Sequence, residues 1–158
     1  YYAELGFDVS PESFENINRG FQSYYEELSH QAELFHGTHD FLSDLHKHGK
    51  DLFILSLAQH DHLQKIVKRH EIFDFFRDVR GHTDFCGRSK VELGKRLVDD
   101  HGLDPKVTAL VGDTNHDYEV AEILGVDAFI IADGHQSYER LARELAQKKA
   151  TVLRTRYG

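Results

Sequence analysis

Residues 52–58, Leu-Phe-Ile-Leu-Ser-Leu-Ala, are apolar on both of the faces that alternate along a β-strand. Such a run is typical of a strand buried on both sides in a parallel sheet. Residues 107–111 and 128–132 repeat the pattern, and stretches with apolar residues at three- and four-residue spacing lie between the runs. This alternation, with its short connections, predicts an α/β fold in which helices cover both faces of a parallel sheet.

Caps and apolar spacing place the expected elements. One helix should be capped by Thr38 and ended by Gly49, and another should be capped by Ser89 and ended by Gly102. Further helices are expected over residues 10–29, 60–70, 117–124 and 137–149, and short strands over 77–80 and 151–153.

The composition excludes several classes of protein. The chain has 158 residues, of which 40% are hydrophobic, and this suffices for a compact domain with a core. Its formal net charge of −8 argues against a general nucleic-acid binder. No apolar run approaches the roughly 20 residues that cross a membrane. The single cysteine, Cys86, leaves no internal disulfide and suits a cytoplasmic protein.

Polar residues follow the apolar runs, at the strand ends where open parallel sheets bind ligands. Ser56 lies near the end of the first run, and Gly112 and Asp113 follow the second, with Asp117 four positions beyond Asp113. Two carboxylates across such a turn suit Mg²⁺, which uses few protein carboxylates together with water and phosphate oxygens. Considered alone, Asp117 could instead cap its helix, and Asp113 could form a turn.

Lys90 stands at an expected helix N-terminus, where a cation opposes the helix dipole unless an anion lies nearby. The Ser56 hydroxyl and the Lys90 ammonium are groups that could bind a phosphoryl oxygen. Alone, each residue also has a structural explanation, as a buried serine with a hydrogen-bond partner and as a solvated lysine.

Taken in order, Ser56, Lys90 and the string Gly-Asp-Thr-Asn-His-Asp at 112–117 resemble the haloacid dehalogenase-like hydrolases. Residues 111–125, followed by Ile-Ala-Asp-Gly-His at 131–135, are most similar to the phosphoglycolate-phosphatase-like branch. The resemblance covers about residues 34–145. It implies a Rossmann-like core that hydrolyses small phosphomonoesters with Mg²⁺ through an aspartyl-phosphate intermediate.

The resemblance also implies roles for single residues. Ser56 and Lys90 would be catalytic and would hold the transferring phosphoryl group. Asp113 would bind Mg²⁺ directly, and Asp117 would help to fix the metal or its waters. A last group, Gly112, Thr114 and Asn115, would shape the turn around the metal.

The chain departs from the family pattern at the nucleophile. The family carries its nucleophile and its acid/base residue in an Asp-x-Asp string, whereas no two aspartates in this chain stand two apart. We therefore expect the nucleophile strand upstream of Tyr1, which also fits a chain that does not begin with methionine. Residues 1–33 are then expected to be part of a helical cap, and residues 34–158 a hydrolase core that lacks its first strand.

Two functions follow from these observations. The leading one is a cytoplasmic phosphatase whose partner is a small phosphorylated metabolite, not nucleic acid or membrane. The alternative is a catalytically incomplete family member that binds a phosphate ligand or a protein partner. A receiver-like signalling domain ranks below both, because no acidic pair precedes a recognisable strand. The histidine pairs fall on different expected elements, so we interpret them as solvated residues instead of zinc ligands.

Overall fold

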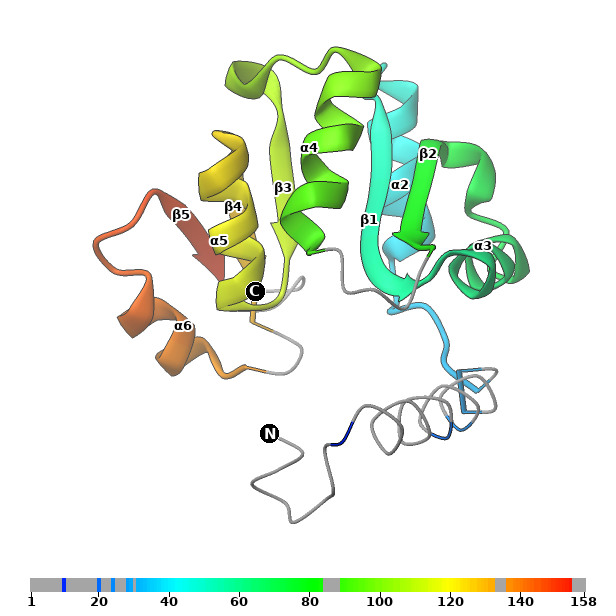
Figure 1. Cartoon of the computed structure of the whole chain (residues 1–158), viewed down its shortest axis with the longest axis horizontal. Helices are drawn as coiled ribbons and strands as arrows, with labels where there is room; N and C mark the ends of the chain where they lie inside the picture. The colour runs from blue at the N-terminus through cyan, green and yellow to red at the C-terminus, as the bar shows by residue number, and fades with distance from the viewer. Residues whose placement is uncertain are drawn as a thin grey trace. The chain divides into compact units, whose positions relative to one another are not determined.

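The computed structural model has an α/β architecture (Figure 1) and describes residues 10, 20, 24, 28, 29, 31–83, 89–132 and 136–154. Its elements follow the order α2 (Thr38–Lys47), β1 (Leu52–Gln59), α3 (His60–Arg69), the 3-10 helix η1 (Phe73–Phe75), β2 (Phe76–His82), α4 (Lys90–His101), the 3-10 helix η2 (Pro105–Val107), β3 (Ala109–Gly112), α5 (Asn115–Leu124), β4 (Asp127–Ile131), α6 (Tyr138–Glu144) and β5 (Ala150–Leu153). None of the helices among these described residues is long and apolar enough to cross a bilayer.

The chain divides into two compact units. The first comprises Tyr1–Ile54 and Ala58–Val79, and the second comprises Leu55–Leu57 and Arg80–Gly158. The middle of β1, which carries Ser56, therefore belongs to the second unit. The expected division into a partial cap at residues 1–33 and a core at 34–158 remains a prediction.

The first unit contains α2, α3, η1 and most of β1. Strands β1 and β2 pair in a two-stranded sheet, and both run downward in Figure 1. The amphipathic helix α3 turns Val67 into the core, where it is buried together with Ile72 and Val79. Leu34, Leu42 and Ile54 pack against this cluster. The expected strand 52–58 and helix 60–70 are thus confirmed.

The second unit contains a parallel sheet in the order β3-β4-β5. Leu110 of β3 is level with Ala128 of β4, and Ala128 is level with Ala150 of β5. The face that holds these residues packs against α5 and α6, where the core consists of Tyr118, Ala121, Val126, Ala128, Ile130, Leu141 and Leu145. The expected strands at 128–132 and 151–153 are confirmed within one residue at each end.

The expected cap at Ser89 is confirmed, because its hydroxyl accepts a hydrogen bond from the first turn of α4. Ser137, where the last helix was expected to begin, is the N-cap of α6, and its hydroxyl accepts from the Arg140 amide. The expectation for Thr38 is wrong. Thr38 is the first helical residue of α2, and the cap is Gly37, whose φ of 76° lies in the left-handed region that glycine adopts without strain.

The observed start of β3 and the observed end of α6 also differ from the expected boundaries. Strand β3 begins at Ala109, because Pro105 starts a 3-10 turn that leaves Val107 85% exposed. Helix α6 ends at Glu144, and residues 145–149 form turns in which the Lys148 amide donates to the Leu145 carbonyl. Most of the expected helix 10–29 lies outside the described residues; those described within 20–29 are helical.

Candidate active site

The Asp113–Asp117 turn joins the end of β3 to the start of α5. Thr114 is the N-cap of α5, and its hydroxyl accepts a hydrogen bond from the Asp117 amide at 3.3 Å. Because the cap lies at Thr114, α5 begins at Asn115, two residues before the expected start at Asp117. Asp117 thus lies in the first turn of α5, where a carboxylate is stabilised by the helix dipole.

Both carboxylate oxygens of Asp117 accept hydrogen bonds. Oδ1 lies 2.5 Å from Nζ of Lys90. Oδ2 accepts from the Asp113 amide at 3.1 Å, the Thr114 amide at 3.1 Å and the Thr114 hydroxyl at 2.8 Å. In this arrangement Asp117 fixes the turn and the lysine, and its two oxygens are occupied by donors from the protein.

Burial by itself would raise the pKa of Asp117. The hydrogen bond and positive charge of Lys90, with further hydrogen bonds from Thr114 and the Asp113 backbone, outweigh that effect. The pKa of Asp117 is therefore lowered from its ordinary value. The residue is ionised at neutral pH and balances the charge of the lysine.

Gly112 makes room for this carboxylate. A Cβ atom built on Gly112 would lie 2.4 Å from both Cβ and Cγ of Asp117, a separation that real Cβ atoms essentially never show. The requirement for glycine at this position comes from the close approach of a side chain. The group that approaches Gly112 is therefore a carboxylate of the protein, and the proposed role of Gly112 in shaping a metal site remains a prediction.

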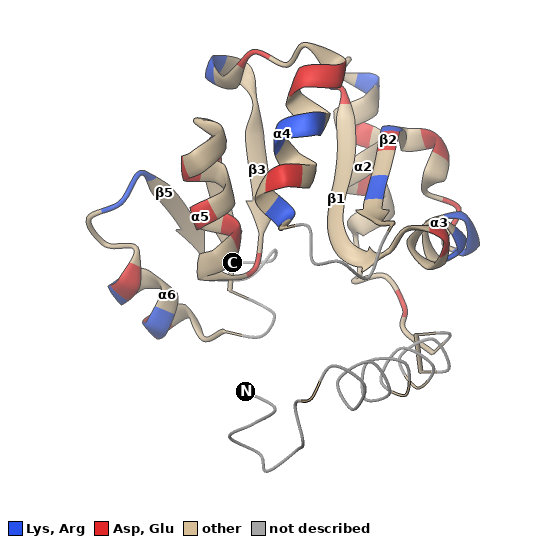
Figure 2. Ribbon diagram, in the orientation of Figure 1, with Lys and Arg blue, Asp and Glu red and all other residues tan. Residues whose placement is uncertain are grey.

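Lys90 is the first residue of α4 and follows the N-cap Ser89, which forms a capping box with Glu92. Basic and acidic residues are interspersed along α4 in Figure 2, and Lys90 stands at its N-terminal end. The Lys90 side chain is 18% exposed. The anion that offsets its unfavourable position at the helix start is Asp117, which the sequence alone did not identify as its partner.

Asp113 differs from Asp117 in its surroundings. It is half-buried, and within the described part of the chain its carboxylate makes no hydrogen bond or ion pair. A half-buried carboxylate with open oxygens fits one direct ligand of Mg²⁺, which takes its other ligands from water and phosphate. Asp117 fits the role of holding the Asp113 backbone. No group of three or more His, Cys, Asp or Glu suited to a metal occurs among the described residues.

Ser56 belongs to the same compact unit as Lys90 and the turn. Its neighbour Leu55 approaches α4, because a Cβ on Gly94 would lie 3.2 Å from Cδ2 of Leu55. Ser56 is half-buried on β1. The structure therefore joins Lys90, Asp113, Thr114 and Asp117 by direct bonds, and it brings Ser56 into their unit.

One residue at this edge was missed from the sequence. The Gln136 side chain binds Asn115 through two hydrogen bonds, one to the backbone amide and one to the side-chain amide. Gln136 stands in the segment between β4 and α6. Nothing in the sequence around it signals that contact.

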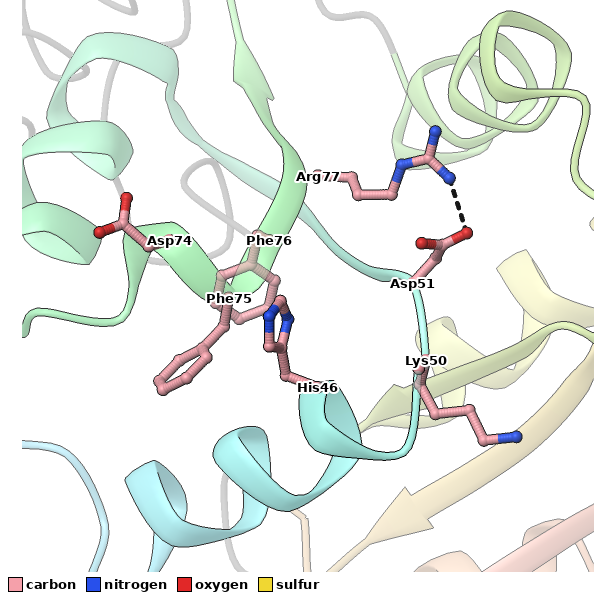
Figure 3. A pocket seen from close by; sticks show the side chains of 8 residues that line it. His46, Lys50, Asp51, Asp74, Phe75, Phe76 and Arg77 are labelled. Atoms are coloured by element: carbon pink, nitrogen blue, oxygen red, sulfur yellow. Dashed lines mark hydrogen bonds and ion pairs between the residues drawn. The ribbon is translucent and has the colours of Figure 1, made fainter.

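A separate hollow of about 190 Å³ lies in the first unit, at the start of β1 and β2 (Figure 3). Arg77 and Asp51 form an ion pair at 2.6 Å beside it. The hollow is lined by His46, Gly49, Lys50, Asp51, Asp74, Phe75, Phe76 and Arg77. Because ligand sites of open parallel sheets lie at the carboxyl ends of strands, this position at the amino ends does not mark it as catalytic.

Most of this chain is similar to proteins of one known family. A model of the family described as haloacid dehalogenase-like hydrolase matches residues 4–131. Phosphoglycolate phosphatases of Aliivibrio fischeri and Vibrio cholerae are 23% and 25% identical to the chain over 137 residues. The match covers 85% of this chain but only 60% and 61% of those relatives.

A solved structure of a predicted phosphatase from Clostridium acetobutylicum superposes with a TM-score of 0.82 at 17% identity. The match covers 96% of this chain and 69% of that one. At such low identity this likeness concerns the fold alone. It agrees with the Rossmann-like α/β architecture expected from the sequence.

Proposed function

The chain belongs to the haloacid dehalogenase-like hydrolases, and on that premise we propose that it supplies the phosphate- and metal-binding part of a Mg²⁺-dependent phosphatase. The substrate would be a small phosphorylated metabolite of the cytoplasm. The phosphoglycolate phosphatases among the relatives support this class of substrate. The bonded group of Lys90, Asp113, Thr114 and Asp117 is the observation that carries the proposal.

In the proposed reaction an aspartate oxygen attacks the phosphorus of the ester, the bond from phosphorus to the leaving oxygen breaks, and that oxygen takes up a proton. Water then attacks the aspartyl phosphate and releases inorganic phosphate. Mg²⁺ would neutralise phosphoryl oxygens during both transfers. The nucleophilic aspartate is not one of these 158 residues, because no Asp-x-Asp string occurs in them.

The residues of this chain would each contribute one interaction. Lys90 would place a positive charge where phosphate charge must be stabilised. Asp117 pairs with that lysine and would hold it in place. The Ser56 hydroxyl would donate a hydrogen bond to a phosphoryl oxygen. Asp113 would be a direct metal ligand.

The test is hydrolysis of a panel of phosphomonoesters by the full-length protein, with and without Mg²⁺. We expect turnover that requires Mg²⁺ and that falls roughly 100-fold or more in Asp113→Asn. Asp99→Asn is the matched control, because Asp99 is an exposed residue of α4 with no side-chain bond among the described residues. Turnover that is independent of Mg²⁺ and of Asp113 would contradict the proposal.

The absence of an Asp-x-Asp string favours a second candidate, a family member that binds a phosphate ligand or a protein without turning a substrate over. Calorimetric titration of the same full-length protein with inorganic phosphate separates the two. Binding of phosphate without turnover of any ester in the panel would favour this second function.

A further inference from the structure

Gln136 and Asn115 form a reciprocal pair of hydrogen bonds. The Asn115 backbone amide donates to Oε1 of Gln136 at 2.9 Å, and Nε2 of Gln136 donates to Oδ1 of Asn115 at 2.9 Å. A backbone amide can only donate, so the first bond fixes which end of the glutamine faces it. The second bond then follows with the correct polarity, and we call the two bonds the Gln136–Asn115 clamp.

The clamp joins two segments that follow neighbouring strands. Asn115 lies just beyond the end of β3, and Gln136 lies beyond the end of β4. Gly112 and Ile130 are level in the parallel sheet, so both segments start from the same edge. This is the edge that carries the Asp113–Asp117 turn.

The bond to Asn115 serves a donor that α5 cannot satisfy itself. Asn115 is the first residue of α5, and the first amides of a helix have no partner within it. Asp117 holds the amides of Asp113 and Thr114, and Gln136 holds the next amide along the chain. Three successive amides of the turn are thus held by two side chains.

We propose that Gln136 is a positioning residue for Asp113, acting through Asn115. This inference rests on the proposed function, because it assigns the clamp the task of orienting a metal-binding carboxylate. Residues that orient the ligands of a metal raise its affinity without touching it. Gln136 would therefore take part in metal binding without itself being a ligand.

The first test concerns the clamp alone. Hydrogen exchange of the Asn115 amide is measured in the full-length protein, in Gln136→Ala and in Gln147→Ala. Gln147 is an exposed residue with no hydrogen bond in the described part of the chain, so its replacement is the matched control. We expect roughly fivefold or faster exchange in Gln136→Ala only, the effect of one lost hydrogen bond. Unchanged exchange would overturn the inference.

Replacements of Asn115 test whether the two hydrogen bonds of the clamp depend on each other. Asn115→Asp keeps an oxygen that accepts from Nε2, and it should retain the protection of the amide. Gln136→Ala removes both bonds at once, so adding Asn115→Ala to it should not accelerate exchange further. Additive effects of the two alanine replacements would contradict a shared clamp.

The second test measures Mg²⁺ itself by calorimetric titration of the full-length protein. We expect the Kd for Mg²⁺ to rise roughly tenfold in Gln136→Ala and to stay unchanged in Gln147→Ala. An unchanged Kd in Gln136→Ala would overturn the inference even if the wild type is an active phosphatase. If the Mg²⁺ affinity depends on Gln136 but the wild type hydrolyses no ester, the result would contradict the proposed function alone.

Discussion

The ammonium of Lys90 lies 2.5 Å from Oδ1 of Asp117, although 27 positions separate the two residues in the chain. Their side chains are 18% and 5% exposed. An ion pair this sheltered is costly to break from one side, because the remaining charge stays buried without a partner. The pair links the start of α4 to the start of α5.

Replacement of one partner should therefore destabilise the protein markedly. We expect Asp117→Asn to lower the free energy of unfolding by about 2–4 kcal/mol, and Lys90→Met to do so by a similar amount. The double variant should lose less than the sum of the two, because it leaves no unpaired charge. Unfolding in urea, followed by circular dichroism, gives the three values.

The exposed pair of Arg77 and Asp51 is the matched control. Its 2.6 Å separation is nearly the same, but the side chains are 55% and 56% exposed. We expect Asp51→Asn to lower the free energy of unfolding by at most about 1 kcal/mol. Equal losses at the two pairs would show that burial does not set the strength of the Lys90–Asp117 pair.

The lowered pKa of Asp117 predicts a dependence of stability on pH. A carboxyl group whose pKa is lower in the folded than in the unfolded state stabilises the fold above the unfolded pKa, near 4. That contribution is lost as the pH falls through the folded-state pKa. The free energy of unfolding of the wild type should therefore fall more steeply below about pH 4 than that of Asp117→Asn. Parallel curves between pH 7 and pH 3 would contradict this.

The sequence predicted the elements of this fold better than their boundaries. Strand β1 and helix α4 were predicted closely, because an apolar run and the Ser89 cap are local signals. The start of β3 was predicted two residues early, because the 3-10 turn that begins at Pro105 includes Val107, the first residue of the apolar run. For Thr38, a favourable cap residue was overridden by the left-handed backbone at Gly37.

In the candidate site too, features that depend on neighbouring residues could be predicted, and contacts between distant residues could not. The string at 112–117 pointed to the turn, because its residues are neighbours in the chain. The partner of Lys90 could not be read from the sequence, because it depends on how α4 and α5 pack. The same holds for Gln136, whose contact with Asn115 spans 21 positions. The proposed ligand role of Asp113 and the proposed phosphate role of Ser56 remain predictions.

Gly112→Ala should disturb the site through Asp117. The added Cβ would lie 2.4 Å from Cβ and Cγ of Asp117, so the carboxylate has to move away from Lys90 and Thr114. We expect a loss of about 1–3 kcal/mol in the free energy of unfolding, as for other overpacked sites. Gly20→Ala is the control, because its Cβ would meet nothing within 4 Å. It should be neutral or stabilising by up to about 1 kcal/mol.

Arg69 of α3 holds the segment before α2 within the first unit. Its Nη2 donates to the carbonyl oxygens of Ser29 at 2.9 Å and Ala32 at 3.0 Å, and His62 binds the Ser29 hydroxyl at 3.0 Å. Arg69→Ala leaves both carbonyls without this donor, so we expect the backbone at Ser29 and at residues 31–32 to open more readily. Hydrogen exchange and limited proteolysis at these residues should accelerate about tenfold or more, since each lost bond to a charged donor costs about 1.5–3 kcal/mol.

Lys65→Ala is the matched control for Arg69→Ala. Lys65 is an exposed cation of the same helix, and its side chain makes no bond within the described residues. Its replacement removes the same charge from α3 but no contact with Ser29 or Ala32, so exchange at Ser29 and at residues 31–32 should stay at the wild-type rate. If both variants accelerate exchange equally, the charge of α3 and not the two hydrogen bonds of Arg69 holds the segment in place.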